Sequence, residues 1–447
     1  MAAANDNTVK VNEVTKITPF SNSTTEFSLP LTLFDTYWLK FFPVERLFFY
    51  QISGLTPDSF NSVILPKLKH SLSLTLLHYL PVAGNLVWPE DATKPAIYYF
   101  PNDGVSLTVA ESNADFDFLS GNGIRPSAEF RPLTPQLSIS DDKTAVLAVQ
   151  ITLFPNQGFC IGISTHHSMF DGRSTVMFMK SWAHLCKQEE ENPSLLPQLT
   201  PSFDRTVIKD TKGIDLVYAN NWLAFTGSDS DPKNRRSEIF SNHSGCEQID
   251  NKQNENEAKQ SAQLQTFVLT LAYAFVCMVK AKGGDSNRDV IYAFKADYRS
   301  RLNPPLPMNY FGSCSGTHAT IAKAGEFMKE TGLAFVSEKL SHMVKEIESG
   351  LTLEGFEDKL VKLMSMMKSV QGGAQGLGVA GSIRLDVYGP DFGWWKPKKV
   401  EIVSIENTGA ISLSESRDGG GRVEIGVVLE KQQMEAFASL FVDGLKS

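Results

Sequence analysis

Apolar and polar positions follow one another in blocks that indicate both strands and helices. The clearest block is Ala145–Phe154, an apolar run of strand length, followed by the turn residues Pro155–Gly158 and a second apolar run, Phe159–Ser164. Two apolar runs joined by a short polar turn are typical of a hairpin in a buried sheet. The chain then takes helical spacing, with an inward face formed by Val176, Met179, Ala183 and Cys186.

Similar patterns predict elements on both sides of this hairpin. A helix is expected from Pro57, with Phe60, Ile64 and Leu68 on one face and a kink or new first turn at Pro66. The other predicted helices are Phe267–Lys282, Phe327–Leu351 and Phe356–Met367. The other predicted strands are Arg46–Ile52, Ile97–Phe100, Val105–Val109, Val290–Lys295, and the hairpin pair Ile411–Ser416 and Val423–Leu429.

Two segments lack such a pattern, and a third has a misleading one. Gln188–Arg205 is acidic and then proline-rich, which favours a linker. Gly245–Gln260 has almost no large apolar residues, which predicts a solvated insert. Gly376–Gly381 matches the G-x-G-x-x-G spacing of dinucleotide-binding loops. Because a helix precedes it and a predicted strand, Ser382–Tyr388, follows it, the order is the reverse of that fingerprint, and a plain loop is expected.

Composition narrows the class of protein. A length of 447 residues allows two or three domains, and a net charge of −8 argues against a nucleic-acid-binding protein. The five cysteines show no C-x-x-C spacing, so neither a disulfide framework nor a metal site is indicated. Met1–Asn12 lacks the apolar segment of a secretory signal. The longest apolar run, Phe267–Val279, has 13 residues, too few to span a bilayer, so a cytoplasmic protein without a membrane partner is expected.

Candidate chemistry lies at the junction between the buried hairpin and its helix. His167 is followed four residues later by Asp171 and then Gly172. A strand end holds a side chain firmly, as a general base requires. The H-x-x-x-D spacing alone is weak evidence, since a structural histidine is the more common explanation. Two further irregular motifs, Asn309–Cys314 and Asp391–Trp395, strengthen the case.

These three motifs, in this order, resemble the BAHD acyltransferases, plant enzymes that move acyl groups from coenzyme A thioesters. The family markers are H-x-x-x-D-G, matched by His167–Gly172, and D-F-G-W-G, matched at four positions by Asp391–Trp395. Asp297–Pro307 followed by Tyr310–Gly312 resembles the branch that acylates anthocyanin, flavonoid and phenolic glucosides. The resemblance covers nearly the whole chain.

The resemblance implies an α/β fold of two chloramphenicol-acetyltransferase-like domains with an active-site channel between them. On this chain the domains would be 1–190, with H-x-x-x-D-G, and 221–447, with the Tyr310 and Asp391 motifs, joined by a crossover linker at 191–220. Acyl-CoA would be a co-substrate rather than a bound cofactor. The implied partners are this donor and a small glycoside acceptor, taken up by a monomer.

The resemblance also implies roles for single residues. His167 would be the general base that takes the proton of the acceptor hydroxyl, with no covalent acyl-enzyme. Trp394 would help to stabilise the oxyanion through its indole N–H, within a largely structural loop that includes Asp391 and Gly393. Asp171 would pair with Arg299 and support the loop that presents His167.

The chain departs from the family pattern at three places. Trp395 replaces a glycine that supplies a backbone angle or clearance, so the loop geometry and the aim of Trp394 are in question. Ser313 replaces the usual asparagine. Between Arg236 and Gln265, the polar stretch Ser237–Gln260 replaces a strand and an amphipathic helix of the relatives. Either an edge element has been lost, or the chain is an altered copy with changed affinity for coenzyme A.

Relatives in this branch most often use malonyl-CoA, whose buried carboxylate needs a cation. Arg173 is the candidate for that contact, although a solvated arginine in the first helical turn is equally plausible. Tyr310 and Ser313 are further candidates for substrate binding. The expected reaction is malonyl transfer to a sugar hydroxyl, at the 6-position, of a phenolic or flavonoid glucoside. The anionic donor also requires a basic path, for which the candidates are Lys280, Lys282, Arg288 and Lys396–Lys399.

Three alternatives remain open at this point. A hydroxycinnamoyl-CoA transferase of the same family would share every motif. A condensation domain of a peptide synthetase shares H-H-x-x-x-D-G but usually belongs to a far longer chain and lacks D-F-G-W. A non-catalytic homologue would bind ligands in the same channel, and Trp395 together with Gly245–Gln260 supports it.

Overall fold

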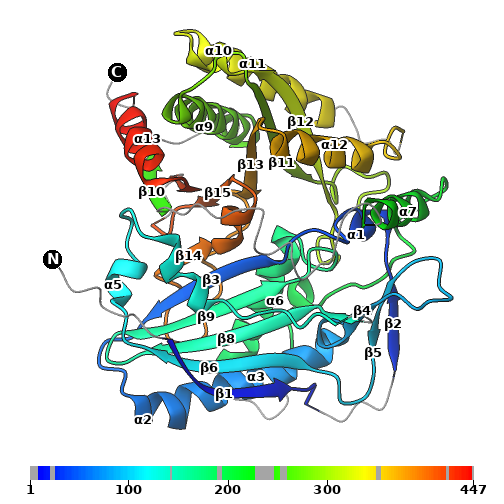
Figure 1. Cartoon of the computed structure of the whole chain (residues 1–447). Coiled ribbons are helices and arrows are strands. Elements are labelled where there is room, and N and C mark those ends of the chain that lie inside the picture. The colour runs from blue at the N-terminus through cyan, green and yellow to red at the C-terminus, as the bar shows by residue number, and fades with distance from the viewer. Residues whose placement is uncertain are drawn as a thin grey trace.

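The computed structural model describes residues 9–20, 26–140, 143–188, 194–226, 246–251, 259–348, 354–418 and 422–444. Over these residues the chain forms an α/β fold with two six-stranded sheets and one four-stranded sheet. Each large sheet has its own covering helices, and the two lie one above the other in Figure 1. The predicted α/β architecture with two sheet-centred halves is therefore confirmed.

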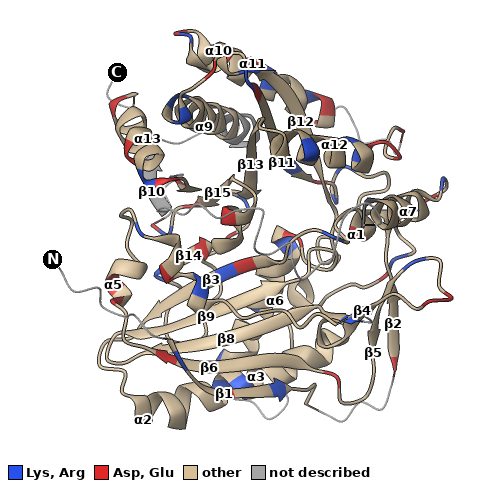
Figure 2. Ribbon diagram, in the orientation of Figure 1, with Lys and Arg blue, Asp and Glu red and all other residues tan. Residues whose placement is uncertain are grey.

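The first large sheet has the strand order β1-β6-β8-β9-β3-β14. Its centre is the predicted hairpin, β8 and β9, in which every residue is buried and none is charged (Figure 2). Strands that are apolar at every position must be covered on both faces. In β3, Phe48 and Tyr50 face the main core, whereas Leu47 and Phe49 face a second apolar cluster. The bounds are β1 Val9–Ile17, β3 Val44–Gln51, β6 Val105–Ser112, β8 Leu147–Phe154, β9 Gly158–Thr165 and β14 Lys399–Ile402.

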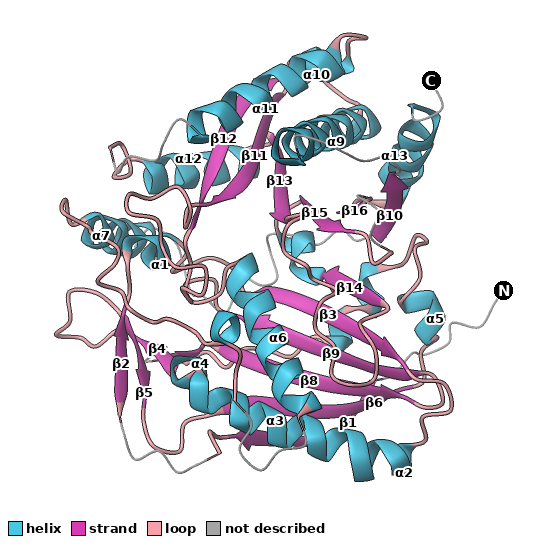
Figure 3. Cartoon of the chain, turned by 180° about the vertical axis from the view of Figure 1, so that it is seen from behind, coloured by secondary structure: helices cyan, strands magenta, loops and turns pink. Residues whose placement is uncertain are grey.

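Two long helices, α3 Leu65–His78 and α6 Gly172–Lys187, pack together on one face of this sheet (Figure 3). The predicted helix from Pro57 is present as α2 Pro57–Ser59, a π-helical turn Phe60–Ile64 and then α3. Pro66 lies in the first turn of α3, as predicted, where its missing N–H leaves no hydrogen bond unmade. The helix α6 begins directly after the His167–Asp171 loop, so its first turn fixes the position of that loop.

The second large sheet has the order β10-β16-β15-β13-β11-β12. The helices α9 Lys259–Lys282, α11 Gly332–Glu348 and α13 Lys431–Gly444 lie together on its outer side (Figures 1 and 3). The stretch Gln265–Lys282 of α9 is long and apolar enough to cross a membrane, yet 56% of it is buried in this fold, as in a core helix. The strands are β10 Cys246–Asn251, β11 Asp289–Asp297, β12 Ser315–Lys323, β13 Gln375–Gly381, β15 Ala410–Glu415 and β16 Val423–Val428.

Three sequence predictions are corrected here. Gly376–Gly381 is not a loop but most of β13, which pairs in parallel with β11 and β15. Ser382–Tyr388 is not a strand, because turns follow β13 directly. The segment Gly245–Gln260 is not wholly an insert, since β10 pairs with β16 and α9 begins at Lys259. Residues 252–258 of that segment, and 419–421 of the last hairpin turn, lie outside the described residues.

The remaining elements lie outside the two large sheets. A four-stranded sheet has the order β2-β5-β4-β7, and the helix α7 Ile214–Thr226 occupies the end of the predicted linker. Ser202 in that linker exchanges backbone hydrogen bonds with Asn309 and Phe311, which ties it to the second half. The other bounds are β2 Phe27–Pro30, β4 Asn85–Val87, β5 Ala96–Tyr99, β7 Lys143–Ala145, α1 Leu33–Tyr37, α4 Leu80–Ala83, α5 Phe116–Leu119, α10 Ala324–Met328 and α12 Lys359–Gln371.

One strand crosses between the halves. β14 follows the second sheet's strands β11 to β13 along the chain, yet it pairs with β3 at the edge of the first sheet. A boundary near residue 220 therefore separates the strands of the two large sheets with one exception. The strand β14 comes after that boundary but belongs to the N-terminal sheet. The buried pair between Arg125 Nη2 and Glu401 Oε1, 2.8 Å apart, joins β14 to a loop of the N-terminal half.

Candidate active site

A cavity of about 760 Å³ lies between the two halves of the molecule. Its walls combine residues at the start of β3 and just after β9 with residues of β11, β12 and β13. Glycines of β13 line it together with Leu377 and Val379. A cavity of this size between two α/β units is where a small-molecule site is expected. His167, Asp171 and Arg173 all line it.

His167 lies just beyond the end of β9 and is almost fully buried. Its ring stacks on Trp38 with centroids 4.2 Å apart and meets Phe41 edge to face. Its Nε2 lies 3.3 Å from Nζ of Lys295, which projects from β11 in the other half. Burial, and then the charge of Lys295, lower the pKa of His167 well below its usual range. The imidazole is therefore neutral at pH 7 and able to accept a proton.

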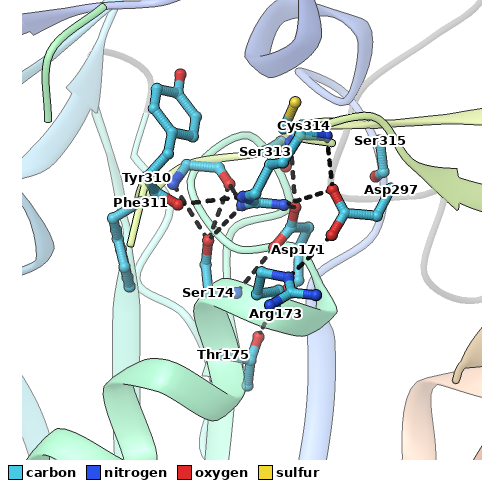
Figure 4. A network of polar contacts seen from close by, with 12 residues as sticks. Asp171, Arg173, Ser174, Thr175, Asp297, Tyr310, Phe311, Ser313, Cys314 and Ser315 are labelled. Atoms are coloured by element: carbon cyan, nitrogen blue, oxygen red, sulfur yellow. Dashed lines mark hydrogen bonds and ion pairs between the residues drawn. The ribbon is translucent and has the colours of Figure 1, made fainter. Parts of the chain in front are cut away.

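Asp171 does not form a hydrogen bond with His167 but belongs to a separate polar network (Figure 4). Its Oδ2 accepts from Nη1 of Arg299 at 2.7 Å and from the backbone N–H of Cys314 at 3.1 Å, while its Oδ1 caps α6 through the N–H of Ser174. This is the ion pair that the sequence predicted. Burial by itself would raise the pKa of Asp171, but the charge and hydrogen bond of Arg299 outweigh it and hold that pKa below its usual range.

Ser313 and Tyr310 are placed behind the site rather than in it. The Ser313 hydroxyl donates to the backbone carbonyl of His167, and its N–H donates to Oδ1 of Asp35 at 3.0 Å. Tyr310 is fully buried beneath the guanidinium groups of Arg205 and Arg299. Neither residue lines the cavity. Their predicted substrate contacts do not fit this structure, because both side chains are used to hold the loops around His167.

The Asp391–Trp395 loop lies at the far end of the first sheet. Trp394 packs edge to face on Phe159, at the start of β9, whereas His167 follows the end of that strand. A strand of this length separates the two by roughly 20 Å. The predicted oxyanion role of Trp394 therefore does not fit the structure.

Two other residues of this loop have structural contacts. Asp391 forms an ion pair with Lys187 of α6 at 2.9 Å and accepts a hydrogen bond from the N–H of Gly393, which has φ +97°. Trp395 has φ +83° and is 78% exposed. The position thus has the backbone angle for which the family uses glycine. The loop anchors the end of α6 and does not reach the cavity.

Arg173 fits its predicted place better. It lines the cavity at the first turn of α6, and its Nε lies 2.9 Å from Oδ2 of Asp297 on β11. The predicted basic path is different, because none of Lys280, Lys282, Arg288 and Lys396–Lys399 lines the cavity. Arg288 is bound to Gln375 and backbone carbonyls, and Lys399 to Asn122 and Glu424.

Sequence reasoning missed several cations that line the cavity, among them Lys295 and Arg46. Nζ of Lys295 lies over the ring of Trp38 at 4.7 Å. Burial, and then the charge of Arg46, lower the pKa of Lys295 to about 8. Its side chain nevertheless reaches water in the cavity. Arg46 is 3% exposed. The sequence feature that could have indicated these two residues is a single cation inside a largely apolar strand: Arg46 in Val44–Gln51 and Lys295 in Val290–Lys295. Among the described residues, no group of three His, Cys, Asp or Glu side chains is placed to hold a metal ion.

Comparison with known proteins extends over the whole chain. The model of the Transferase family matches residues 7–443. The malonyl-CoA:anthocyanidin 5-O-glucoside-6''-O-malonyltransferase of Arabidopsis thaliana is 44% identical, covering 98% of each chain. Phenolic glucoside malonyltransferase 1 of the same plant is 41% identical, covering 99% of each chain.

Solved structures share the fold at lower identity. Vinorine synthase superposes with a TM-score of 0.64 at 19% identity, covering 96% of each chain. TRI101 of F. sporotrichioides, complexed with coenzyme A and T-2, superposes with a TM-score of 0.63 at 13% identity, covering 92% of this chain and 97% of that one. Both similarities support the two-sheet arrangement described above.

Proposed function

This chain belongs to the BAHD acyltransferases of the Transferase family, which are acyl-CoA-dependent enzymes, and from that premise we propose that it transfers a malonyl group from malonyl-CoA to a sugar hydroxyl of a phenolic or flavonoid glucoside. The observation that carries the proposal is the neutral imidazole of His167 in a cavity that Arg46, Arg173 and Lys295 also line. A neutral base suits an alcohol acceptor, and the cations suit an acyl group that ends in a carboxylate.

His167 acts as general base in this reaction. As the acceptor oxygen attacks the thioester carbonyl, its proton passes to Nε2 of His167, and the carbonyl becomes an oxyanion. When the carbonyl re-forms, the C–S bond breaks, and the protonated imidazole returns the proton to the departing thiolate. Atoms and charges balance without a covalent acyl-enzyme. Proton transfer by a positioned histidine contributes about 10²- to 10⁴-fold in rate.

Arg173 is one of the cavity-lining cations that attract the acyl carboxylate, from the first turn of α6. Its Nε is 2.9 Å from Oδ2 of Asp297. Arginine is suited to this task, because its fork of donors matches a carboxylate in a bidentate arrangement.

The test is a donor panel with the purified chain and a phenolic glucoside acceptor. We expect malonyl-CoA to have a higher kcat/KM than coumaroyl-CoA, measured by thiol release and by the mass of the acylated product. A higher value for coumaroyl-CoA would instead make the chain a hydroxycinnamoyl transferase. Absence of acceptor-dependent thiol release with every donor would favour the non-catalytic homologue.

A further inference from the structure

The nitrogen that His167 needs for catalysis is already in contact with a cation. Nζ of Lys295 lies 3.3 Å from Nε2 of His167, close enough for the ammonium to donate to the lone pair of the neutral ring. A base whose lone pair accepts from an ammonium group cannot accept the proton of an acceptor hydroxyl at the same time. The resting arrangement therefore masks the base.

Within the described part of the chain, Lys295 has no carboxylate partner that would hold it elsewhere. Among the described residues, no ion pair includes it, and its other contacts are the faces of Trp38 and Phe41 at 4.7 and 5.3 Å. The nearest acid on its own strand, Asp297, is bound to Arg173 and Arg299. An anion that entered the cavity would thus meet an ammonium group free to turn toward it.

Arg46 provides a second cation at the same cavity. It is 3% exposed, and its Nε and Nη1 have no hydrogen-bond partner among the described residues, although the charges of Glu415 and Asp171 act on it. Its Nη2 lies 3.7 Å from the position that a Cβ on Gly172 would take, which places the guanidinium against the first residue of α6. Buried guanidinium nitrogens are normally hydrogen-bonded, so these two atoms indicate a missing anionic ligand.

We propose that the distal carboxylate of the donor's acyl group is this missing anion, and that it draws Lys295 away from His167 toward Arg46 and so unmasks the base. The inference rests on the proposed malonyl transfer and adds a specificity mechanism to it. Standard bond lengths place the malonyl carboxyl carbon roughly 2.5 Å from the thioester carbon, so a carboxylate bound here keeps the reacting carbon near His167.

The mechanism makes Lys295 a positioning residue that selects donors through His167. A carboxylated donor binds the ammonium and frees Nε2 in one step. An acetyl group, which has no carboxylate, leaves the ammonium on the imidazole. Malonyl-CoA and acetyl-CoA should therefore differ in kcat as well as in KM. If Lys295 only bound the carboxylate, the two donors would differ mainly in KM.

The test compares malonyl-CoA with acetyl-CoA in the wild-type chain and in Lys295→Met. We expect the variant to lose malonyl transfer at least tenfold and to gain acetyl transfer, so that the ratio of the two kcat/KM values falls by about 10²-fold or more. Lys368→Met is the matched control, because Lys368 also lines the cavity but does not contact His167. It removes the same charge, and we expect the malonyl-to-acetyl ratio to stay at the wild-type value.

An unchanged ratio in Lys295→Met, or an equal loss with both donors, would overturn the inference. If the wild type transfers malonyl and Lys295→Met keeps the wild-type preference for malonyl-CoA over acetyl-CoA, only this mechanism is refuted. If the wild type is inactive with malonyl-CoA, the proposed function is refuted. If Lys295→Met does not fold, ¹⁵N-histidine NMR of the wild-type chain replaces it. The unreactive carba analogue of malonyl-CoA should shift the Nε2 resonance of His167, and that of acetyl-CoA should not.

Discussion

The imidazole of His167 owes its chemistry to the side chains packed around it. The stack on Trp38 and the edge contact with Phe41 exclude water and fix the ring plane, and Lys295 adds a nearby positive charge. Each of these disfavours the protonated ring, so the base is neutral before substrate arrives. The preceding His166 differs, because its Nδ1 accepts the backbone N–H of Ser168 and supports the loop.

This difference predicts the outcome of replacing each histidine by glutamine. We expect His167→Gln to lower kcat by about 10²- to 10⁴-fold, because an amide cannot take the acceptor's proton, with only a small change in Tm. His166→Gln is the matched control, since its amide oxygen can still accept from the loop, and most of the activity should remain. Steady-state kinetics and thermal unfolding measure both effects. Equal activities in the two variants would exclude His167 as the base.

A second residue-scale prediction concerns Trp395. Its φ of +83° is unfavourable for any side chain, and its ring is 78% exposed. A residue with a side chain in the left-handed region costs about 1–2 kcal/mol of folding free energy, which glycine would avoid. Part of that gain is offset because glycine makes the unfolded chain more flexible. We therefore expect Trp395→Gly to raise the free energy of unfolding by up to about 1 kcal/mol in urea titrations. Trp394→Gly should lower it by about 1 kcal/mol or more, since Trp394 packs on Phe159. A loss in both variants would contradict the strain argument.

At the scale of elements, the first turn of α6 is where the two halves are joined chemically. Asp171 caps this helix and binds Arg299, which also donates to the backbone carbonyl of Gly312 at 2.8 Å. The helix, the strand β11 and the loop before β12 therefore share one buried network (Figure 4). The position of His167 depends on this network, because its loop ends at Asp171.

The network predicts a pH-dependent cost for Asp171→Asn. Asparagine keeps the helix cap but leaves Arg299 without its charge partner, which costs about 3–5 kcal/mol. Since the folded pKa of Asp171 lies below the unfolded value, its contribution is complete above about pH 5 and is lost as the pH falls through the folded pKa. The wild type and the variant should therefore differ most at neutral pH and converge in acid.

Urea unfolding between pH 2 and 7 measures that difference. Asp386→Asn is the control, because Asp386 pairs with Lys180 of the same helix at the surface and its side chain is 60% exposed. Such a pair contributes about 1 kcal/mol or less. A stable but inactive Asp171→Asn would show that Asp171 acts in the chemistry and not through the fold.

Sequence patterns predicted the elements whose signal is local. The strands β8 and β9 are mostly apolar and carry no charge, and α6 has one apolar face at helical spacing, so both were found. The strand β13 was missed because Gly376, Gly378 and Gly381 give no alternation. Its parallel partners are 80 residues or more earlier, in β11, and about 30 later, in β15. Gly381 has no room for a side chain, because its φ is +87° and an added Cβ would clash with the backbone oxygen of Leu413. No local pattern reveals that contact.

At the scale of the whole molecule, the site is made by elements far apart in sequence. The order of the three motifs indicated the family, and the family pattern pointed to His167 and to an ion pair between Asp171 and Arg299. The structure contains this ion pair. The same order could not locate Trp394, which packs at the opposite end of β9. Lys295 and Arg46 meet only through tertiary packing, so their shared cavity was invisible to residue spacing.

The crossing strand β14 holds the two halves around that cavity. Glu401 on it forms a fully buried pair with Arg125, whereas Glu406, just beyond it, pairs with Arg131, whose side chain is 47% exposed. Removing one partner of a buried pair leaves a charge without compensation and costs about 3–5 kcal/mol, while exposed pairs contribute about 1 kcal/mol or less.

We therefore expect Glu401→Ala to lower the free energy of unfolding several times more than Arg131→Ala, although both remove an arginine–glutamate contact between the same segments. Because β14 belongs to the first sheet and Lys399 on it reaches Glu424 of β16, the loss should destabilise both halves together. Calorimetry measures this as one transition moved to lower temperature. Similar small losses in both variants would mean that β14 is held by its backbone pairing with β3 alone, and that the cavity walls are not joined through Glu401.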